Sequence, residues 1–263
     1  AMIPSGYKAS KLYSVLPTNG AGDFTTTRAS VATRVNENGL LEEVASNVPR
    51  LDYSDGGCPS LLLEANATNL ITYSEDFSDA SWGKNNVTIT SNSAISPDGT
   101  LNADLLNFTS SGNYVDKSGA ISIGQTYTIS CYVKSAVSSS QTFTIYGNAN
   151  KLSGTLTATT EWQRFTLTFV SDISAMSSGI SSVDLSQLYV YGFQLEVDSY
   201  STSYIKTVGS SQTRTADTAN LNLTSFTLTS ITETIGGVEQ SPITVIPSTY
   251  TIPFGKINKI IMI

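Results

Sequence analysis

The sequence contains no histidine among its 263 residues. This absence excludes histidine-based nucleophile triads, histidine metal ligands and an imidazole proton shuttle. Charged residues make up only 13% of the chain, which argues against salt-bridge networks and long solvated helices. The 21 acidic residues outnumber the 14 basic ones, and the resulting pI near 4.5 disfavours nucleic acid or an anionic membrane surface as a partner. No apolar run approaches the roughly 20 residues that span a bilayer, so we expect no membrane insertion.

Motifs of catalysis and of metal binding are also missing. The chain has no Gly-x-Ser-x-Gly elbow, no Walker loop and no dinucleotide fingerprint. Its two cysteines, Cys58 and Cys131, lack a metal-type spacing, and Cys131 lies in an apolar alternation that predicts a buried free thiol. Two positioned carboxylates can hydrolyse a glycosidic bond, but among 21 acidic residues some pair always looks plausible. We therefore expect no enzyme.

A period of two dominates residues 66–218. Along 125–134, one side of the expected strand carries Tyr127, Ile129, Cys131 and Val133, and the other side carries Thr126, Thr128, Ser130, Tyr132 and Lys134. Segments 141–146, 162–170 and 188–196 alternate in the same way, and Ser, Gly and Asn fill the separations. No apolar stripe of helical period exceeds two turns. The sequence predicts an all-β protein with an antiparallel β-sandwich in its middle.

The two ends of the chain lack the regular alternation of the middle. Residues 1–65 are irregular, with a possible hairpin around Asn38-Gly39 and a short buried strand over 61–64. Residues 241–263 hold three prolines, which suit an edge strand or an extended arm, and the apolar run 257–263 must be covered or paired. A subunit interface would cover it, and so would folding back over the sandwich. We expect three parts: an N-terminal packing segment (1–65), a sandwich (66–218) and a C-terminal β arm (219–263).

The sandwich region resembles jelly-roll carbohydrate-binding modules. In segment 69–82, an Asn-Leu pair precedes Phe77 and Trp82, as at the opening of those modules, and segments 124–134 and 161–165 are similar to their middle strands. The resemblance implies a jelly-roll fold. It also implies that Trp82 and Trp162 lie in the core, at positions where such modules bury a tryptophan.

A second resemblance covers most of the chain up to Asp217. Segments 24–30, 33–39, 49–53, 58–64, 191–196 and 204–207 look like bacteriophage virion proteins of the tail or head-fibre type. This implies a structural or host-attachment role in the virion, with other virion proteins, a host surface glycan and further copies of the chain as partners, a homotrimer being favoured. The alternative is a carbohydrate-binding module of a secreted bacterial protein, and a third possibility is a polysaccharide depolymerase spike.

Sugar recognition requires exposed aromatic rings beside polar groups, because the C–H face of a pyranose packs on a flat ring. Tyr132 and Tyr146 have the outward parity of their strands, with Lys134, Arg164 and Gln194 as candidate polar neighbours. The alternative is ordinary cross-strand pairing of surface tyrosines. The stripe of Tyr189, Tyr191 and Phe193 is instead expected to face the core.

Calcium is common in jelly-roll modules and is bound by carboxylate and backbone oxygens. Glu75, Asp76, Glu196 and Asp217 lie on the first and last strands of the expected sandwich, which are neighbours in that fold. These four carboxylates are the candidate ligands of a structural calcium ion. No EF-hand pattern accompanies them.

Overall fold

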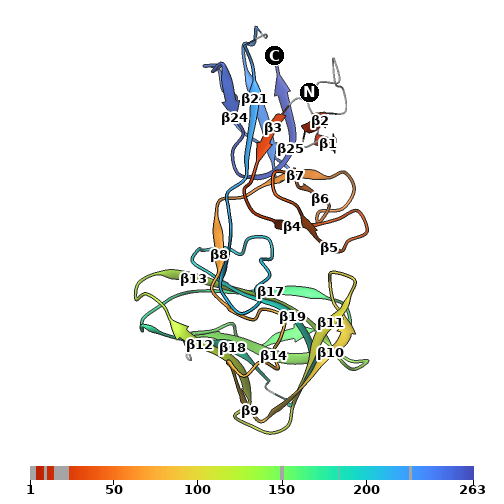
Figure 1. The fold of residues 1–263 in the computed structure, drawn as a ribbon, viewed down its shortest axis with the longest axis vertical. Helices are drawn as coiled ribbons and strands as arrows, with labels where there is room; N and C mark the ends of the chain where they lie inside the picture. Colours follow the sequence, from red (N-terminus) through yellow and green to blue (C-terminus); the bar gives the residue numbers. More distant parts are fainter. Residues whose placement is uncertain (1–3, 9–10, 15–23, 149–150, 183, 225–226) are drawn as a thin grey trace. The chain divides into compact units, whose positions relative to one another are not determined.

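The computed structural model describes residues 4–8, 11–14, 24–148, 151–182, 184–224 and 227–263 (Figure 1). Every regular element in these ranges is a β-strand, which confirms the all-β prediction. The described ranges accordingly contain no helix that is long and apolar enough to cross a membrane. The chain forms two compact units. Unit 1 combines Ala1–Ala67 with Arg214–Ile263, and unit 2 is Thr68–Thr213.

Unit 2 is an antiparallel jelly-roll sandwich of two sheets. Sheet I has the order β10 (Val87–Ile95), β11 (Leu101–Phe108), β19 (Gln187–Glu196), β13 (Thr126–Ser135), β17 (Gln163–Val170). Sheet II has the order β15 (Lys151–Leu152), β14 (Gln141–Gly147), β18 (Ala175–Ser182), β12 (Tyr114–Ala120), β9 (Trp82–Asn85), with β16 (Leu156–Ala158) also paired to β14. β10 and β11 form a hairpin and β14 pairs with β15 and β16, but the other neighbouring strands are far apart in sequence, which is typical of this fold.

The core of unit 2 follows the predicted alternation. The inward side chains of β13, including Ile129, Cys131 and Val133, are fully buried, whereas Tyr132 and Lys134 on the other side are half-buried. Trp82 lies in the core as expected, with its ring centroid 4.9 Å from that of Phe77. Such aromatic pairs contribute about 0.5–1.5 kcal/mol beyond the burial of their area.

A β-bulge in β19 overturns the expected inward stripe. Leu188 and Val190 face the core, but Gly192 has a φ of +66° and the register with β13 shifts there. The extra residue reverses the parity, so that Phe193 faces the core while Tyr189 and Tyr191 lie on the outer face. Glycine suits this position because a left-handed backbone carries little steric cost without a Cβ.

Unit 1 contains two further five-stranded sheets. One has the order β1 (Pro4–Lys8), β2 (Lys11–Ser14), β3 (Phe24–Thr27), β21 (Thr218–Asn222), β24 (Thr249–Thr251). The other has the order β23 (Val238–Glu239), β22 (Ile231–Ile235), β25 (Gly255–Met262), β7 (Ser60–Leu63), β6 (Leu51–Asp52). The hairpin expected around Asn38-Gly39 is present as β4 (Ala32–Val35) and β5 (Leu41–Val44).

The two end segments therefore form one unit rather than an irregular segment and a separate arm. Phe24 of β3 pairs with Leu221 of β21, and Leu61 of β7 pairs with Ile257 of β25. The apolar C-terminal run is thus paired within the chain, with Ile257 and Ile260 fully buried and only Ile263 largely exposed. Strand β25 is central in its sheet, contrary to the expectation of an edge, because it begins only after the last proline.

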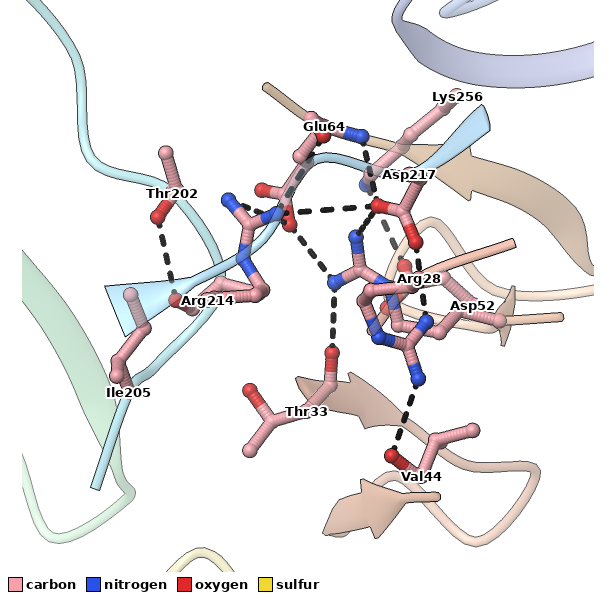
Figure 2. Close-up of polar contacts among 12 residues, drawn as sticks. Arg28, Thr33, Val44, Asp52, Glu64, Thr202, Ile205, Arg214, Asp217 and Lys256 are labelled. Atoms are coloured by element: carbon pink, nitrogen blue, oxygen red, sulfur yellow. Dashed lines mark hydrogen bonds and ion pairs between the residues drawn. The ribbon is translucent and has the colours of Figure 1, made fainter. Parts of the chain in front are cut away.

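A buried ionic cluster joins the two segments of unit 1 (Figure 2). Asp217 accepts a hydrogen bond from Arg28 at 3.0 Å through Oδ1, and its Oδ2 accepts from Arg50 and from the backbone N–H of Glu64. Arg50 also donates to the Glu64 carboxylate at 2.7 Å, and Arg214 lies 3.5 Å from the same group. The three arginines are at most 2% exposed. Burial lowers the pKa of Arg28, and its bonds to Asp217 oppose that shift.

Candidate functional site

The five predicted sugar-binding residues do not share one face. Tyr132, Lys134 and Arg164 lie on the outer face of sheet I, whereas Tyr146 of β14 lies on the outer face of sheet II. Gln194 is fully buried: its Oε1 accepts a hydrogen bond of 2.7 Å from the Ile205 backbone. The structure thus divides the predicted set between two surfaces and assigns Gln194 a structural role in holding the segment after β19.

Four residues form a row across the outer face of sheet II. Tyr146 pairs with Gly179, Gly179 pairs with Asp116, and Asp116 pairs with Gly83, so the row crosses strands β14, β18, β12 and β9. Tyr146 and Asp116 are each 8% exposed although both lie on the outer face. Tyr114 is two residues before Asp116 on the same face and is 38% exposed.

Asp116 offers one oxygen to a ligand. Its Oδ2 accepts a hydrogen bond of 2.7 Å from Ser177, while its Oδ1 makes no hydrogen bond among the described residues. A Cβ added at Gly83 would collide with Oδ1, and one added at Gly179 would collide with the backbone of β12. Both glycines therefore permit the close approach of their strands to Asp116, and Gly83 leaves the space in front of Oδ1 open.

The Tyr146 hydroxyl is the second polar group of the row. It makes no hydrogen bond among the residues that the structure describes, and burial, Asp116 and Tyr114 together raise the pKa of its phenol. The group therefore remains a neutral donor and acceptor at any physiological pH. Tyr114, Asp116 and Tyr146 together supply an exposed ring, a carboxylate and a hydroxyl, which are the groups that recognise sugar hydroxyls and C–H faces.

The outer face of sheet I carries a second aromatic group, in two rows across three strands. In one row, Tyr191, Tyr132 and Arg164 are consecutive cross-strand partners, and the guanidinium lies 5.4 Å from the Tyr132 ring centroid. In the other row, Lys134 pairs with Tyr189, and its Nζ lies 5.5 Å from that ring and 5.0 Å from the Trp162 ring.

The expectation that Trp162 is a core residue is wrong. Its ring is half-buried on the outer face of sheet I, and its Nε1 donates a 3.0 Å hydrogen bond to the Ile95 carbonyl. The alternation of this segment already indicates the outer position. Trp162 has the same parity as Arg164, which faces outward, and the opposite parity to Phe165, which packs against the core. Three further residues of the two outer faces, Tyr114, Asp116 and Tyr189, are also absent from the sugar-binding residues predicted from the sequence.

The four predicted calcium ligands do not form one site. Among the described residues, no group of three or more His, Cys, Asp or Glu side chains is arranged to hold a metal ion. Asp217 belongs to the ionic cluster of unit 1, and Glu196 is 1% exposed and accepts hydrogen bonds from Thr202, with burial raising its pKa. The Asp76 Oδ1 accepts from the backbone of Ser78 at 3.0 Å. Calcium binding stays a prediction.

Glu75 and Asp76 line a pocket of about 480 Å³ in unit 2. Lys206 closes one side with an ion pair of 2.6 Å to Glu75, so an ammonium group already neutralises this carboxylate. Asp104 lies deeper, at 2% exposure, and both its oxygens accept backbone hydrogen bonds. Burial raises the pKa of Asp104, and the nearby charges of Asp76 and Glu75 add to the shift. These contacts assign the carboxylates a structural role.

The sandwich is similar to known binding domains. Residues 69–186 match the model of a family described as a carbohydrate binding domain, which is less than half of the chain. No curated protein matches the chain.

Several solved structures are similar at low identity. The CBM22-1 xylan-binding domain from Paenibacillus barcinonensis is 15% identical over 53% of this chain and 98% of that one, with a TM-score of 0.37. A CBM22-1–GH10 xylanase structure from Clostridium thermocellum, complexed with xylohexaose, is 11% identical over 56% and 30%, with a TM-score of 0.39. Tailspike protein 4 of bacteriophage CBA120 is 10% identical over 48% and 21%, with a TM-score of 0.31. With TM-scores this low, the family match alone supports the conclusion that unit 2 contains a sandwich similar to carbohydrate binding domains.

Proposed function

We propose that unit 2 is a non-catalytic module that binds a neutral glycan on the outer face of sheet II. The observation that carries this proposal is the row of Tyr146, Gly179, Asp116 and Gly83, with Tyr114 beside it. The match of residues 69–186 to a carbohydrate binding domain supports a glycan as the ligand class.

The chemistry of the row suits uncharged sugars. The Asp116 carboxylate accepts hydrogen bonds from sugar hydroxyls, and the Tyr146 hydroxyl both donates and accepts. The exposed ring of Tyr114 provides a flat apolar surface for the C–H face of a pyranose. The negative charge of Asp116 repels sugars that carry carboxylates or sulfates. With one stacking ring and a few hydrogen bonds, we expect micromolar-to-millimolar affinity, roughly −4 to −8 kcal/mol.

Calorimetric titration with soluble xylan, β-glucan and mannan tests the proposal. Tyr114→Ala and Asp116→Asn should each weaken binding of the recognised glycan by about tenfold, which is 1.4 kcal/mol. Phe254→Ala is the matched control, since it removes an aromatic ring that is 52% exposed in unit 1. Binding that survives both sheet II substitutions would remove this face from the site. Absence of binding to every neutral glycan would overturn the function.

The wider role is a separate proposal. The sequence resemblance to tail and head-fibre proteins supports a place in a phage virion, with host attachment through the glycan and a homotrimer as the assembly. A secreted bacterial carbohydrate-binding protein is the alternative, and a depolymerase spike is the third. The mass of the intact chain by light scattering tests the assembly: a trimer favours the virion role, and a monomer that binds glycan favours the secreted module. Loss of polysaccharide viscosity on incubation would favour the depolymerase.

A further inference from the structure

Two cations on the outer face of sheet I make no direct ion pair among the described residues. Lys134 and Arg164 form no ion pair with any carboxylate in the described part of the chain, and the protein as a whole carries a net charge of −7. Their partners are instead neutral groups: the rings of Trp162, Tyr189 and Tyr132, and the Ser130 hydroxyl, to which Arg164 donates at 2.9 Å.

Aromatic rings compensate these charges only in part. A cation over an aromatic face gains about 0.5–2 kcal/mol, and the full charge remains to act on a ligand. The Nε of Arg164 is buried without a hydrogen-bond partner among the described residues. Solvent does not reach that atom, so an anion approaches the exposed part of the half-buried guanidinium and supplies the countercharge that the rings and the Ser130 hydroxyl do not.

Two carboxylates of this region, Asp98 and Glu196, make hydrogen bonds to other groups. Asp98 accepts hydrogen bonds from Thr100, Asn102 and Tyr191. Although burial opposes the shift, hydrogen bonds lower the pKa of Asp98 to about 2. Glu196 is 1% exposed and accepts hydrogen bonds from the backbone and the hydroxyl of Thr202, and burial raises its pKa while the charge of Arg164 partly opposes that shift. Neither group forms an ion pair with Lys134 or Arg164.

We propose that the outer face of sheet I is a second binding site, specific for glycans that carry carboxylates. Arg164 and Lys134 lie on adjacent strands at diagonal positions, so their backbone attachments are about 7–8 Å apart. A polymer of uronic acid residues presents one carboxylate on each sugar, and successive carboxylates meet the two cations. The half-buried rings of Trp162 and Tyr189 flank Lys134 and contact the C–H faces of the sugars. This site is independent of the proposed neutral-glycan site, which lies on the other sheet.

The test compares oligogalacturonate with the same oligosaccharide after reduction of its carboxyl groups. Calorimetric titration of the full chain in 25 mM NaCl should give at least fivefold tighter binding of the carboxylated form, and 200 mM NaCl should reduce the difference by screening. The double variant Lys134→Gln/Arg164→Gln should lose the preference for the carboxylated form. Lys259→Gln is the control, because it removes a half-buried lysine of unit 1 that makes no ion pair among the described residues.

Further variants keep the proposal falsifiable. The conservative Arg164→Lys should retain a preference for the carboxylated form, and thermal unfolding of each variant should show that unit 2 still folds. Asp116→Asn on sheet II weakens only the neutral-glycan site, so the affinity that depends on Lys134 and Arg164 for the carboxylated form should persist in this variant, which separates the two sites. Equal binding of the two oligosaccharides by the wild type, or a preference that persists in the double variant, would overturn the proposal.

Discussion

The two units of this protein have similar architecture but are assembled from the chain in opposite ways. Unit 2 is one continuous stretch, Thr68–Thr213, whereas unit 1 combines two segments separated by the whole of unit 2. In unit 2, an alternating apolar pattern buries a large core that includes Cys131 and Phe193. Unit 1 has a smaller apolar core and, in addition, the ionic cluster of Arg28, Arg50 and Asp217 with its neighbours.

This difference concerns how strand register is specified. Within a continuous sandwich, the period of two already fixes which side chains face inward. Strands from distant segments have no connecting turn to set their register. A buried cluster of charges is satisfied in one arrangement only, and such clusters can specify structure even where they add little net stability. We infer that Asp217 and its arginines set the register between the segments of unit 1. The following predictions test this contrast, in order of decreasing effect.

Removal of the residues after Asn220 should unfold unit 1 and leave unit 2 intact. The truncation deletes the last two residues of β21 and the whole of β22, β23, β24 and β25, including the fully buried Ile257 and Ile260. Scanning calorimetry of the full chain should show two transitions, and the truncated chain should keep only that of unit 2. Loss of both transitions would show that the units are not independent.

Arg50→Met should destabilise unit 1 by about 3–5 kcal/mol, because the buried carboxylates of Asp217 and Glu64 each lose a charge-assisted hydrogen bond worth about 1.5–3 kcal/mol. Arg50 is fully buried and bonds both Asp217 and Glu64. The transition of unit 1 should move to lower temperature while that of unit 2 stays unchanged. Lys259→Met provides the comparison at a lysine without an ion pair among the described residues. If Arg50→Met were as stable as the wild type, the cluster would have no part in holding the segments together.

Gly192→Ala should destabilise unit 2 alone, by about 1–3 kcal/mol, since a non-glycine residue in the left-handed region is strained. A Cβ at Gly192 would lie 3.2 Å from the Tyr204 ring, so packing adds to the strain. Gly112→Ala is the matched control, with a φ of +68° and open space around the new Cβ. Chemical denaturation should give a larger loss for Gly192→Ala. Equal losses would mean that only backbone strain matters in the bulge.

Glu233→Gln should have the smallest effect and should change the pH dependence of unit 1. Burial raises the pKa of Glu233, although its bond from Tyr250 partly opposes the shift. A raised pKa means that the charged carboxylate disfavours the folded state, so this group reduces stability as pH rises above its unfolded value of about 4.5. Below that pH the penalty is absent. The variant should therefore gain stability over the wild type between pH 5 and 8 and none at pH 4, as measured by the unit 1 transition.

The sequence predicts the sandwich of unit 2 well, because β13 and β17 alternate without interruption. It fails at Gly192, where a single extra residue in β19 reverses the parity and moves Tyr189 and Tyr191 to the outer face. The sequence contains no local signal that Leu61 pairs with Ile257, because the two residues lie far apart in the chain. For that reason, the two end segments could not be predicted to form one unit.

The candidate site on sheet II is hidden in the sequence by a buried lysine. In β12, Tyr114 and Asp116 face outward, but Lys117 takes an inward position with Val115. Its Nζ lies 5.6 Å from the Trp82 ring, and burial lowers its pKa. A charged residue on the core side breaks the apolar alternation, so the strand shows no clear faces. Tyr146 was predicted because its own strand, β14, alternates cleanly.

The ends of unit 2 lie next to each other. The chain enters it in β8 (Ala67–Asn69) and leaves it in β20 (Gln212–Arg214), and these two strands pair. Thr68 and Thr213, its first and last residues, are joined by a hydrogen bond of 2.8 Å between their hydroxyls. Because its two ends are adjacent, unit 2 is inserted between the two segments of unit 1 in the way that a long loop would be. We therefore expect that unit 2 can be exchanged as one piece without altering the strands of unit 1.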